Sequence, residues 1–335
     1  MKKIIIPIII VIVLTLLIGG YFLSRSKSKT DLTKTSVRFP IPIVEAGQVG
    51  FYVAKEKGYY REEGLDVTFE HSTSTLGPIR AVAAKVNDFG MIGGLDTFIV
   101  ERSRGRSLKA IAILHKNAEF IALYTLKDSG LTTVKDIAGK KVGFFYGHIS
   151  QDFIRSYLRN ENITVEEVGM KYYDYGRLTS GDVDAMPGFK ATVLPDVEDK
   201  DIKVNIIDPA DSKMVMQGYT IFVTEDSLRE KPKIIEKFLR ATLRGYRDSV
   251  IDPEEAVGLL VKNDTSLSKA VELKRMPYYN KPMSRDPYGY MDEQMFQVTY
   301  DRLNRLGLIA TPFNIQDALD SSFVEKVDVR GADSK

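Results

Sequence analysis

Apolar and polar positions follow two alternating patterns along this chain, one typical of helices and the other of strands. Val49, Tyr52 and Val53 fall at helical spacing, whereas residues 65–69 alternate as a strand does. The same pair of patterns then recurs several times. It predicts strands at 37–42, 66–70, 89–92, 108–114, 141–145, 168–172, 183–186 and 204–207, with helices at 48–57, 76–86, 94–104 and 150–159.

This alternation of strands and helices predicts an α/β fold with doubly wound, mostly parallel sheets. Two apolar runs, 120–125 and 219–224, are expected to carry the chain across a hinge between two lobes. Later helices, predicted within 232–325, should pack back on the first lobe, with an irregular surface segment over 276–290. We therefore expect a first lobe of residues 37–125 and 219–335 and a second lobe of residues 126–218.

The amino-terminal segment has the pattern of a membrane anchor. The run from Ile4 to Ser24 carries no charge and is long enough to span a bilayer, with basic residues on both sides. We predict a transmembrane signal anchor at 1–24 and a polar tether at 25–36, with the body of the protein outside the cell membrane. A cleaved signal sequence is the alternative.

Composition narrows the possible functions. A chain of 335 residues can bury ample core, and its net charge of +2 gives no reason to expect a nucleic-acid partner. With no cysteine there is no disulfide, thiolate nucleophile or cysteine metal site. The three histidines lack metal-ligand spacing, and no nucleophile-elbow or phosphate-loop motif occurs. We expect no catalytic residue, metal or cofactor.

Polar residues at predicted strand ends are the candidates for ligand binding, because open α/β sheets bind ligands there. Glu45 and Gln48 lie after the first strand, and Gly93, Gly94 and Asp96 lie at a turn where a helix begins. Free backbone N–H groups at that helix start would favour a ligand rich in hydrogen-bond acceptors. The alternatives are a solvated Glu45 and an Asp96 that only stabilises its helix.

The next strands add five further candidates. Lys116 and Asn117 could place a cation and an amide in the cleft, although a solvated lysine is equally open. Tyr146, His148 and Ser150 follow a strand and begin a helix, combining an aromatic surface with a capping hydroxyl. Helix capping alone is the alternative for Ser150.

Three more candidates complete the predicted binding site. Phe189 and Lys190, which follow the VDAM segment, could form the opposite wall. Tyr219, at the return crossing, could stack on a ligand or hydrogen-bond to it. Packing between the lobes is the alternative role for these aromatic side chains.

Several segments, taken in order, resemble a known family. They are GFYVAKEKGYYREEGLDV, DFGMIGGLDTFIVERSRGRSLKAIAIL and SGDVDAM, within a resemblance covering residues 37–328. They are similar to ABC-importer solute-binding proteins of the thiamine-pyrimidine, nitrate, sulfonate and taurine group. The resemblance implies a type II periplasmic-binding-protein fold, a small-molecule ligand, and a permease with its ATPase as partners. We expect a monomer.

The first loop departs from the pyrimidine-binding branch of that group. There the loop resembles W-x-P-N-x-x-H-x-G, but this chain has Pro42, Glu45 and Gln48 where that motif has Trp, Asn and His. This departure argues against a thiamine-pyrimidine ligand. Within the group as a whole, the expected ligand is an aromatic or heterocyclic small molecule, pyrimidine-like or similar, with a sulfonate-like or other small anion as the second possibility.

Two other functions remain open at this point. The same fold resembles thiamine-pyrimidine synthases and menaquinone-pathway enzymes, although the synthases carry a cysteine-rich motif that this chain lacks. A sensor ectodomain that reports ligand occupancy to a partner protein is the third possibility.

Overall fold

The computed structural model describes residues 31–327, except 75, 146–148, 172 and 284–287. Residues Lys34–Lys335 form one unit, which is described by itself. The strands are β1 (Thr33–Phe39), β2 (Leu65–His71), β3 (Phe89–Gly94), β4 (Leu108–Ala118), β5 (Ile121–Leu126), β6 (Lys141–Phe144), β7 (Glu166–Gly169), β8 (Met186–Phe189), β9 (Val204–Ile207) and β10 (Met216–Thr224).

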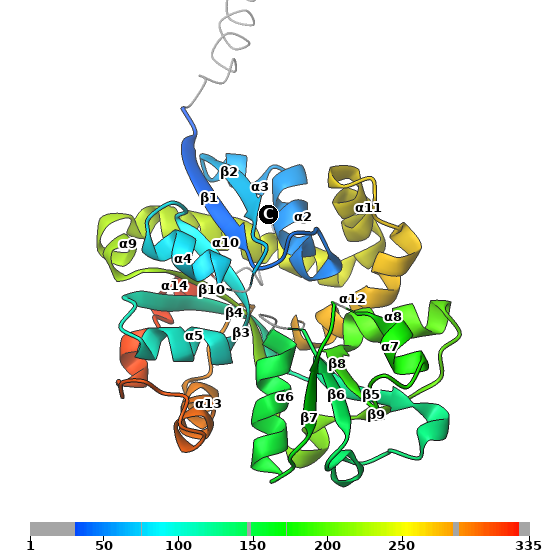
Figure 1. Ribbon diagram of the computed structural model, residues 1–335. Helices are drawn as coiled ribbons and strands as arrows, with labels where there is room; N and C mark the ends of the chain where they lie inside the picture. Colours follow the sequence, from blue (N-terminus) through cyan, green and yellow to red (C-terminus); the bar gives the residue numbers. More distant parts are fainter. Residues whose placement is uncertain (1–30, 75, 146–148, 172, 284–287, 328–335) are drawn as a thin grey trace, which may run out of the picture. The chain divides into compact units, whose positions relative to one another are not determined.

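Helices connect and cover these strands. The α-helices are α2 (Val49–Glu56), α3 (Tyr59–Glu62), α4 (Gly77–Ala83), α5 (Leu95–Ser103), α6 (Ile149–Asn160), α7 (Tyr175–Thr179), α8 (Lys190–Asp199), α9 (Glu225–Glu230), α10 (Pro232–Ile251), α11 (Pro253–Asn263), α12 (Lys269–Met283), α13 (Glu293–Arg305) and α14 (Ser322–Lys326). Short 3₁₀ turns include η1 (Ala46–Gln48) and η5 (Ile315–Ala318). Figure 1 shows β5–β9 grouped with α6, α7 and α8, and β1–β4 grouped with α2–α5.

The larger sheet has the strand order β2-β1-β3-β10-β4. β1 runs parallel to β3, whereas β10 runs antiparallel to both β3 and β4. β3 and β4 therefore point the same way, and β10 is the reversed strand between them. The end of β2 lies beside the end of β1, because the Ser72 N–H donates to the Phe39 carbonyl at 3.0 Å. The amino ends of the following helices thus gather at one edge of this sheet.

Strands β5 to β9 repeat this arrangement. β5 lies between β8 and β9 and runs antiparallel to both, while β6 and β7 are parallel to each other. The Gly143 N–H donates to the Ala185 carbonyl at 2.9 Å, which places β6 alongside the start of β8. The reversed strands β5 and β10 include the two apolar runs predicted to cross the hinge. The division into lobes remains a prediction, and we keep the names first and second lobe for the predicted residue ranges.

Most of the carboxyl-terminal helices pack on helices of the predicted first lobe, whereas α12 also contacts α8 of the predicted second lobe. α10 lies against α2, α13 against α5, and α14 against α10. The approach of α10 to α2 needs a glycine, because a Cβ atom on Gly245 would lie 2.0 Å from the Gly50 carbonyl oxygen. These contacts hold the helices that follow β1 and β3 in place.

Three sequence-based predictions of local structure were wrong. Residues Phe89–Gly94 are wholly β3, so Gly93 and Gly94 end a buried strand instead of forming a turn. The strand predicted at 183–186 lies at Met186–Phe189. The segment 276–290 is not irregular surface throughout, because α12 continues to Met283 and buries Met276 and Tyr279 despite two internal prolines.

The predicted anchor at 1–24 lies outside the described residues. Within the described ranges, no helix is both long and apolar enough to cross a membrane.

Candidate functional site

Four aromatic rings meet where β4, β10, the start of β5 and α12 converge. They belong to His115, Phe120, Tyr219 and Tyr279, and we call this cluster the aromatic junction. The His115 ring lies 4.7 Å from the Tyr219 ring and 4.9 Å from the Phe120 ring, and Tyr279 stacks on Tyr219 at 5.9 Å. All four side chains are buried. The junction is therefore a packed aromatic surface at the predicted crossings between the lobes.

Tyr219 holds an unusual backbone conformation in this junction. Its φ of 43° lies in the left-handed region, which costs a non-glycine residue about 1–3 kcal/mol. The ring also needs a glycine opposite it, because a Cβ on Gly47 would lie 2.4 Å from the Tyr219 ring. The surrounding packing thus fixes the Tyr219 ring at a defined position against the loop after β1.

A buried carboxyl group adjoins the junction. The Tyr219 hydroxyl donates to Glu45 Oε1 at 2.5 Å, and burial raises the Glu45 pKa, although the bond from Tyr219 and the charge of Arg275 partly oppose this rise. Next to it, the Ala46 N–H donates to Glu272 Oε2 at 2.8 Å. The loop after β1 is thereby tied to both β10 and α12.

His115 differs from its neighbours in having unmet hydrogen-bonding capacity. Burial lowers its pKa to about 3, so the ring is neutral near pH 7. A neutral imidazole has one donor and one acceptor nitrogen, and neither has a partner among the described residues. Since buried polar groups normally find partners, His115 is an energetically unfavourable feature of an otherwise well-packed cluster.

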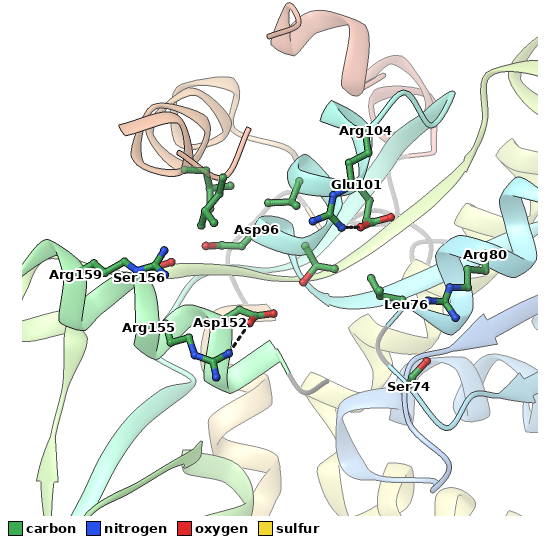
Figure 2. A pocket seen from close by; sticks show the side chains of 14 residues that line it. Ser74, Leu76, Arg80, Asp96, Glu101, Arg104, Asp152, Arg155, Ser156 and Arg159 are labelled. Carbon is green, nitrogen blue, oxygen red and sulfur yellow. Dashed lines mark hydrogen bonds and ion pairs between the residues drawn. The ribbon is translucent and has the colours of Figure 1, made fainter. Parts of the chain in front are cut away.

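A cavity of about 560 Å³ opens between α5 and α6, and Figure 2 shows the side chains that line it. We call it the interhelix cavity. Residues from α4, α5, α6 and α13 and their adjoining loops form its wall: Ser74, Leu76, Arg80, Asp96, Thr97, Val100, Glu101, Arg104, Asp152, Arg155, Ser156, Arg159, Leu303 and Leu308. α5 follows β3 of the first lobe and α6 follows β6 of the second, so the two helices bring the ends of different sheets to one space.

Ion pairs order the charged wall of this cavity. Arg155 lies 3.6 Å from Asp152, and Glu101 forms a salt bridge with Arg104, as the dashed lines in Figure 2 show. Burial raises the Asp152 pKa, and the nearby Asp96 adds to this shift. Arg80 makes no ion pair with any described residue. The cavity thus offers both acceptors and cations to a solute.

The described residues contain no group of three histidine, aspartate or glutamate side chains that could hold a metal ion. The aromatic junction offers ring surface, and the lining of the interhelix cavity offers charged and hydroxyl groups.

The structure brings some of the predicted site residues together. Glu45 and Tyr219 are hydrogen-bonded, and Gly94 pairs in register with Gly218, which precedes Tyr219. Asp96 lies in the first turn of α5 and lines the interhelix cavity. Gln48 is buried, and its Nε2 lies 3.4 Å from the Ile43 carbonyl.

Other predicted residues lie elsewhere or cannot be placed. Lys190, the first residue of α8, forms an ion pair with Asp208. The Lys116 ammonium lies 5.2 Å from the centre of the Tyr290 ring. Phe189 ends β8 and reaches the Phe120 ring at 6.4 Å. Tyr146 and His148 lie outside the described residues, as do the side chains of Asn117 and Ser150.

Sequence reasoning missed several residues in or beside the aromatic junction and the interhelix cavity. Arg155 and Arg159 are spaced i and i+4 on α6, a visible sign of a shared helix face. Tyr279 gave a misleading signal, because the prolines around it favoured an irregular segment. Nothing in the sequence indicated that Arg302 of α13 would reach Asp96 across more than 200 intervening residues, where the two pair at 2.5 Å.

Comparison with known proteins identifies similar chains. A riboflavin-binding protein, RibY of Chloroflexus aurantiacus, is 25% identical over 292 residues, covering 82% of this chain and 81% of its own. A formylaminopyrimidine-binding protein of Halalkalibacterium halodurans is 22% identical over 281 residues, covering 81% and 84%. Relatives also include enzymes, such as a yeast 4-amino-5-hydroxymethyl-2-methylpyrimidine phosphate synthase that is 25% identical over 228 residues, covering 62% and 65%.

Solved structures give the fold. The periplasmic sulfonate-binding protein SsuA of Methylobacillus flagellatus superposes with a TM-score of 0.68 at 18% identity, covering 89% of this chain and 94% of that one. This likeness confirms the predicted periplasmic-binding-protein fold. The family model described as "NMT1/THI5 like" matches residues 46–256. The chain therefore belongs to the NMT1/THI5-like family, and it is similar both to solute-binding proteins and to enzymes.

Proposed function

We propose that this protein is the extracytoplasmic solute-binding component of an ABC importer, which captures a small organic solute in the interhelix cavity and delivers it to a permease. The observation that carries this proposal is the cavity itself. Its volume of about 560 Å³ falls within the roughly 300–1,000 Å³ of small-molecule sites. Its walls come from helices that follow strands of two different sheets, the usual place for ligands in this fold class.

The lining supports an organic solute with both apolar and polar parts. Leu76, Val100, Leu303 and Leu308 give apolar surface, and charged side chains provide a limited set of orienting contacts. Two relatives are named for binding flavin and pyrimidine compounds, and a structural neighbour for sulfonates. We favour an aromatic nitrogen heterocycle over a sulfonate.

Filling the cavity tests the proposal. Thr97→Trp and Ser156→Trp, made in the full-length chain, should each weaken solute binding at least tenfold, because the indole would occupy the space of the ligand. Val298→Trp is a matched control, since Val298 is exposed on α13 and does not line the cavity. Binding would be measured by calorimetry against riboflavin, pyrimidines, alkanesulfonates and nitrate. Undiminished affinity in both cavity variants would refute this site.

A synthase-like enzyme is the alternative, supported by the fungal relatives. Mass spectrometry of the ligand after prolonged incubation separates the two functions, because a binding protein returns the solute unchanged. Protease digestion of intact cells should in addition cleave residues 34–335 if the body lies outside the membrane, with residues 1–24 as its proposed anchor. Chemical turnover, or a protected body, would favour the enzyme.

A further inference from the structure

Helix α12 contacts elements that belong to both of the main sheets. It packs on β4 of the larger sheet and on η1, and it also packs on α8, the helix that follows β8 of the three-stranded sheet. By the predicted ranges, α12 belongs to the first lobe and α8 to the second. Figure 1 shows these two helices side by side, away from α5 and α6, which line the interhelix cavity. α12 is therefore placed where it can influence how the two lobes are arranged.

Two basic residues of α12 form ion pairs with acidic residues of α8. Lys274 Nζ lies 2.8 Å from Asp199 Oδ1 and 3.3 Å from Glu198 Oε1. Arg275 Nη2 lies 3.7 Å from Asp196 Oδ1, and these two side chains are less exposed than those of the neighbouring pair. We call these contacts the α12–α8 ion pairs. Each of them joins a residue of one predicted lobe to a residue of the other.

The guanidinium of Arg275 extends this set of contacts to the loop after β1. Arg275 Nη1 donates to Glu272 Oε1 at 2.8 Å, and Glu272 Oε2 accepts from the Ala46 N–H at 2.8 Å. The Glu272 side chain is only 2% exposed, and each of its oxygens has a donor, as a buried carboxylate requires. A continuous series of polar contacts thus runs from the loop after β1 through α12 to α8.

The carboxyl-terminal half of α12 belongs to the aromatic junction. Tyr279 lies one helical turn beyond Arg275 and stacks on Tyr219 of β10. A displacement of α8 relative to β4 must therefore disturb either the junction or the α12–α8 ion pairs. The junction is buried and closely packed, whereas the Lys274 and Asp199 side chains are 41% and 45% exposed. The ion pairs are the weaker contact and are expected to break first.

We propose that the α12–α8 ion pairs hold the two lobes at their resting separation and thereby set the width of the interhelix cavity. While the pairs are formed, α8 stays against α12. When they break, the lobes rotate about the crossings beside the aromatic junction, and α8 moves away from α12. Surface ion pairs add little to the stability of a fold, but a small free energy still changes the ratio of two lobe arrangements several-fold.

The distance between two spin labels tests this proposal on the protein without any solute. The chain has no cysteine, so Asp128→Cys and Thr265→Cys provide the sole labelled positions. Thr265 is exposed between α11 and α12. Asp128 is exposed just beyond the end of β5, at the opposite end of that strand from Phe120 and the junction. Double electron–electron resonance on the full-length chain then measures the distance between the lobes.

Neutral substitutions should change this distance. Asp196→Asn combined with Lys274→Gln removes charge from both contacts, and should lengthen the most populated label distance by at least about 2 Å. Lys231→Gln is a matched control. Lys231 Nζ lies 2.7 Å from Asp88 Oδ1 at a comparable exposure, but both residues belong to the first lobe. The control should keep the wild-type distance, and circular dichroism would check that every variant folds.

A charge exchange separates the ion pairs from a general effect of substitution. Lys274→Glu alone should also lengthen the label distance, because it places like charges opposite Asp199 and Glu198. Adding Asp199→Lys should return the distance toward the wild-type value, because opposite charges face each other again. High salt should lengthen the distance in wild type more than in the neutral variant, since screening weakens exposed pairs.

The outcomes are independent of the proposed function, because no solute takes part. Equal label distances in wild type, in Lys231→Gln and in the neutral double variant would overturn the role of the α12–α8 ion pairs. A lengthening in Lys274→Glu that Asp199→Lys does not reverse would overturn it as well. Either result would leave the solute-binding function standing, and a failure to bind any solute would not alter the measured distances.

Discussion

The aromatic junction lies where β4, β10 and the start of β5 meet, whereas the interhelix cavity lies between the helices that follow β3 and β6, and the two regions differ in burial and in charge. The junction is closed, its four rings are buried, and its acid, Glu45, is held by a tyrosine hydroxyl. The cavity is open, and charged side chains in ion pairs form much of its wall. One region is built as solid packing and the other as an accessible space.

This difference assigns different roles to the two regions. Burying aromatic area stabilises the fold, so the junction is suited to fixing how β4, β5, β10 and α12 meet. Ion pairs between exposed side chains contribute little to stability, so the exposed charges of the cavity wall, such as Arg104 and Asp152, are free to serve recognition. If the comparison is right, mutations in the junction should act on folding and mutations in the cavity on binding.

The largest expected effect comes from removing a ring of the junction. Phe120→Ala should lower the free energy of unfolding by about 3–5 kcal/mol, because it deletes a buried aromatic side chain and leaves a void. Thr97→Ala, on the cavity wall, should change it by less than about 0.5 kcal/mol. Urea denaturation followed by circular dichroism measures both. Equal losses of unfolding free energy in Phe120→Ala and Thr97→Ala would contradict the distinction between the aromatic junction and the interhelix cavity.

The next effect concerns the buried acid and its pH dependence. Burial raises the Glu45 pKa above its ordinary value of 4.5, so the folded protein retains a proton that the unfolded chain releases. Glu45 therefore costs stability as the pH rises from about 4.5 through its raised pKa, and the cost is constant above that range. Each unit of pKa shift corresponds to about 1.4 kcal/mol.

Glu45→Gln isolates this contribution, since glutamine does not titrate. The stability of the variant relative to wild type should increase with pH across that window and then level off. Asp152 also has a raised pKa, but its contribution is common to both proteins and cancels in the difference. The raised pKa of Glu272 owes part of its shift to the charge of Glu45, so the variant loses that part too, which changes the difference in the same direction. A difference that does not vary between pH 4 and 8 would contradict a raised pKa for Glu45.

Much of the fold could be predicted from the sequence because it depends on local periodicity. The helix at 150–159 and the strand at 204–207 required only the spacing of apolar residues, and they match α6 and β9 closely. α12 could not be predicted to its end, because Pro277 and Pro282 oppose a helix locally. Its burial against β4, η1 and α8 outweighs that local preference.

The candidate site was less accessible to sequence reasoning, since it depends on contacts between distant residues. Glu45 and Tyr219 were both chosen from strand ends, but their hydrogen bond joins residues that are 174 positions apart in the sequence. His115 was noted only for lacking metal-ligand spacing, and its unsatisfied nitrogens emerge only from its neighbours. Sequence reasoning selected positions near strand ends, but it could not show which distant side chains contact them.

The smallest effect is expected from an ion pair on the cavity wall. Arg155 of α6 donates through Nε to Glu167 at 2.8 Å and lies near Asp152, and the side chains of these two acids are 38% and 61% exposed to solvent. Arg155→Gln should therefore lower the free energy of unfolding by no more than about 1 kcal/mol. The loss should shrink in 1 M salt, because screening weakens exposed pairs. Urea denaturation at low and high salt measures this. A loss of 3 kcal/mol that salt leaves unchanged would mean that the cavity wall supports the fold as the junction does, and the division of roles between the two regions would fail.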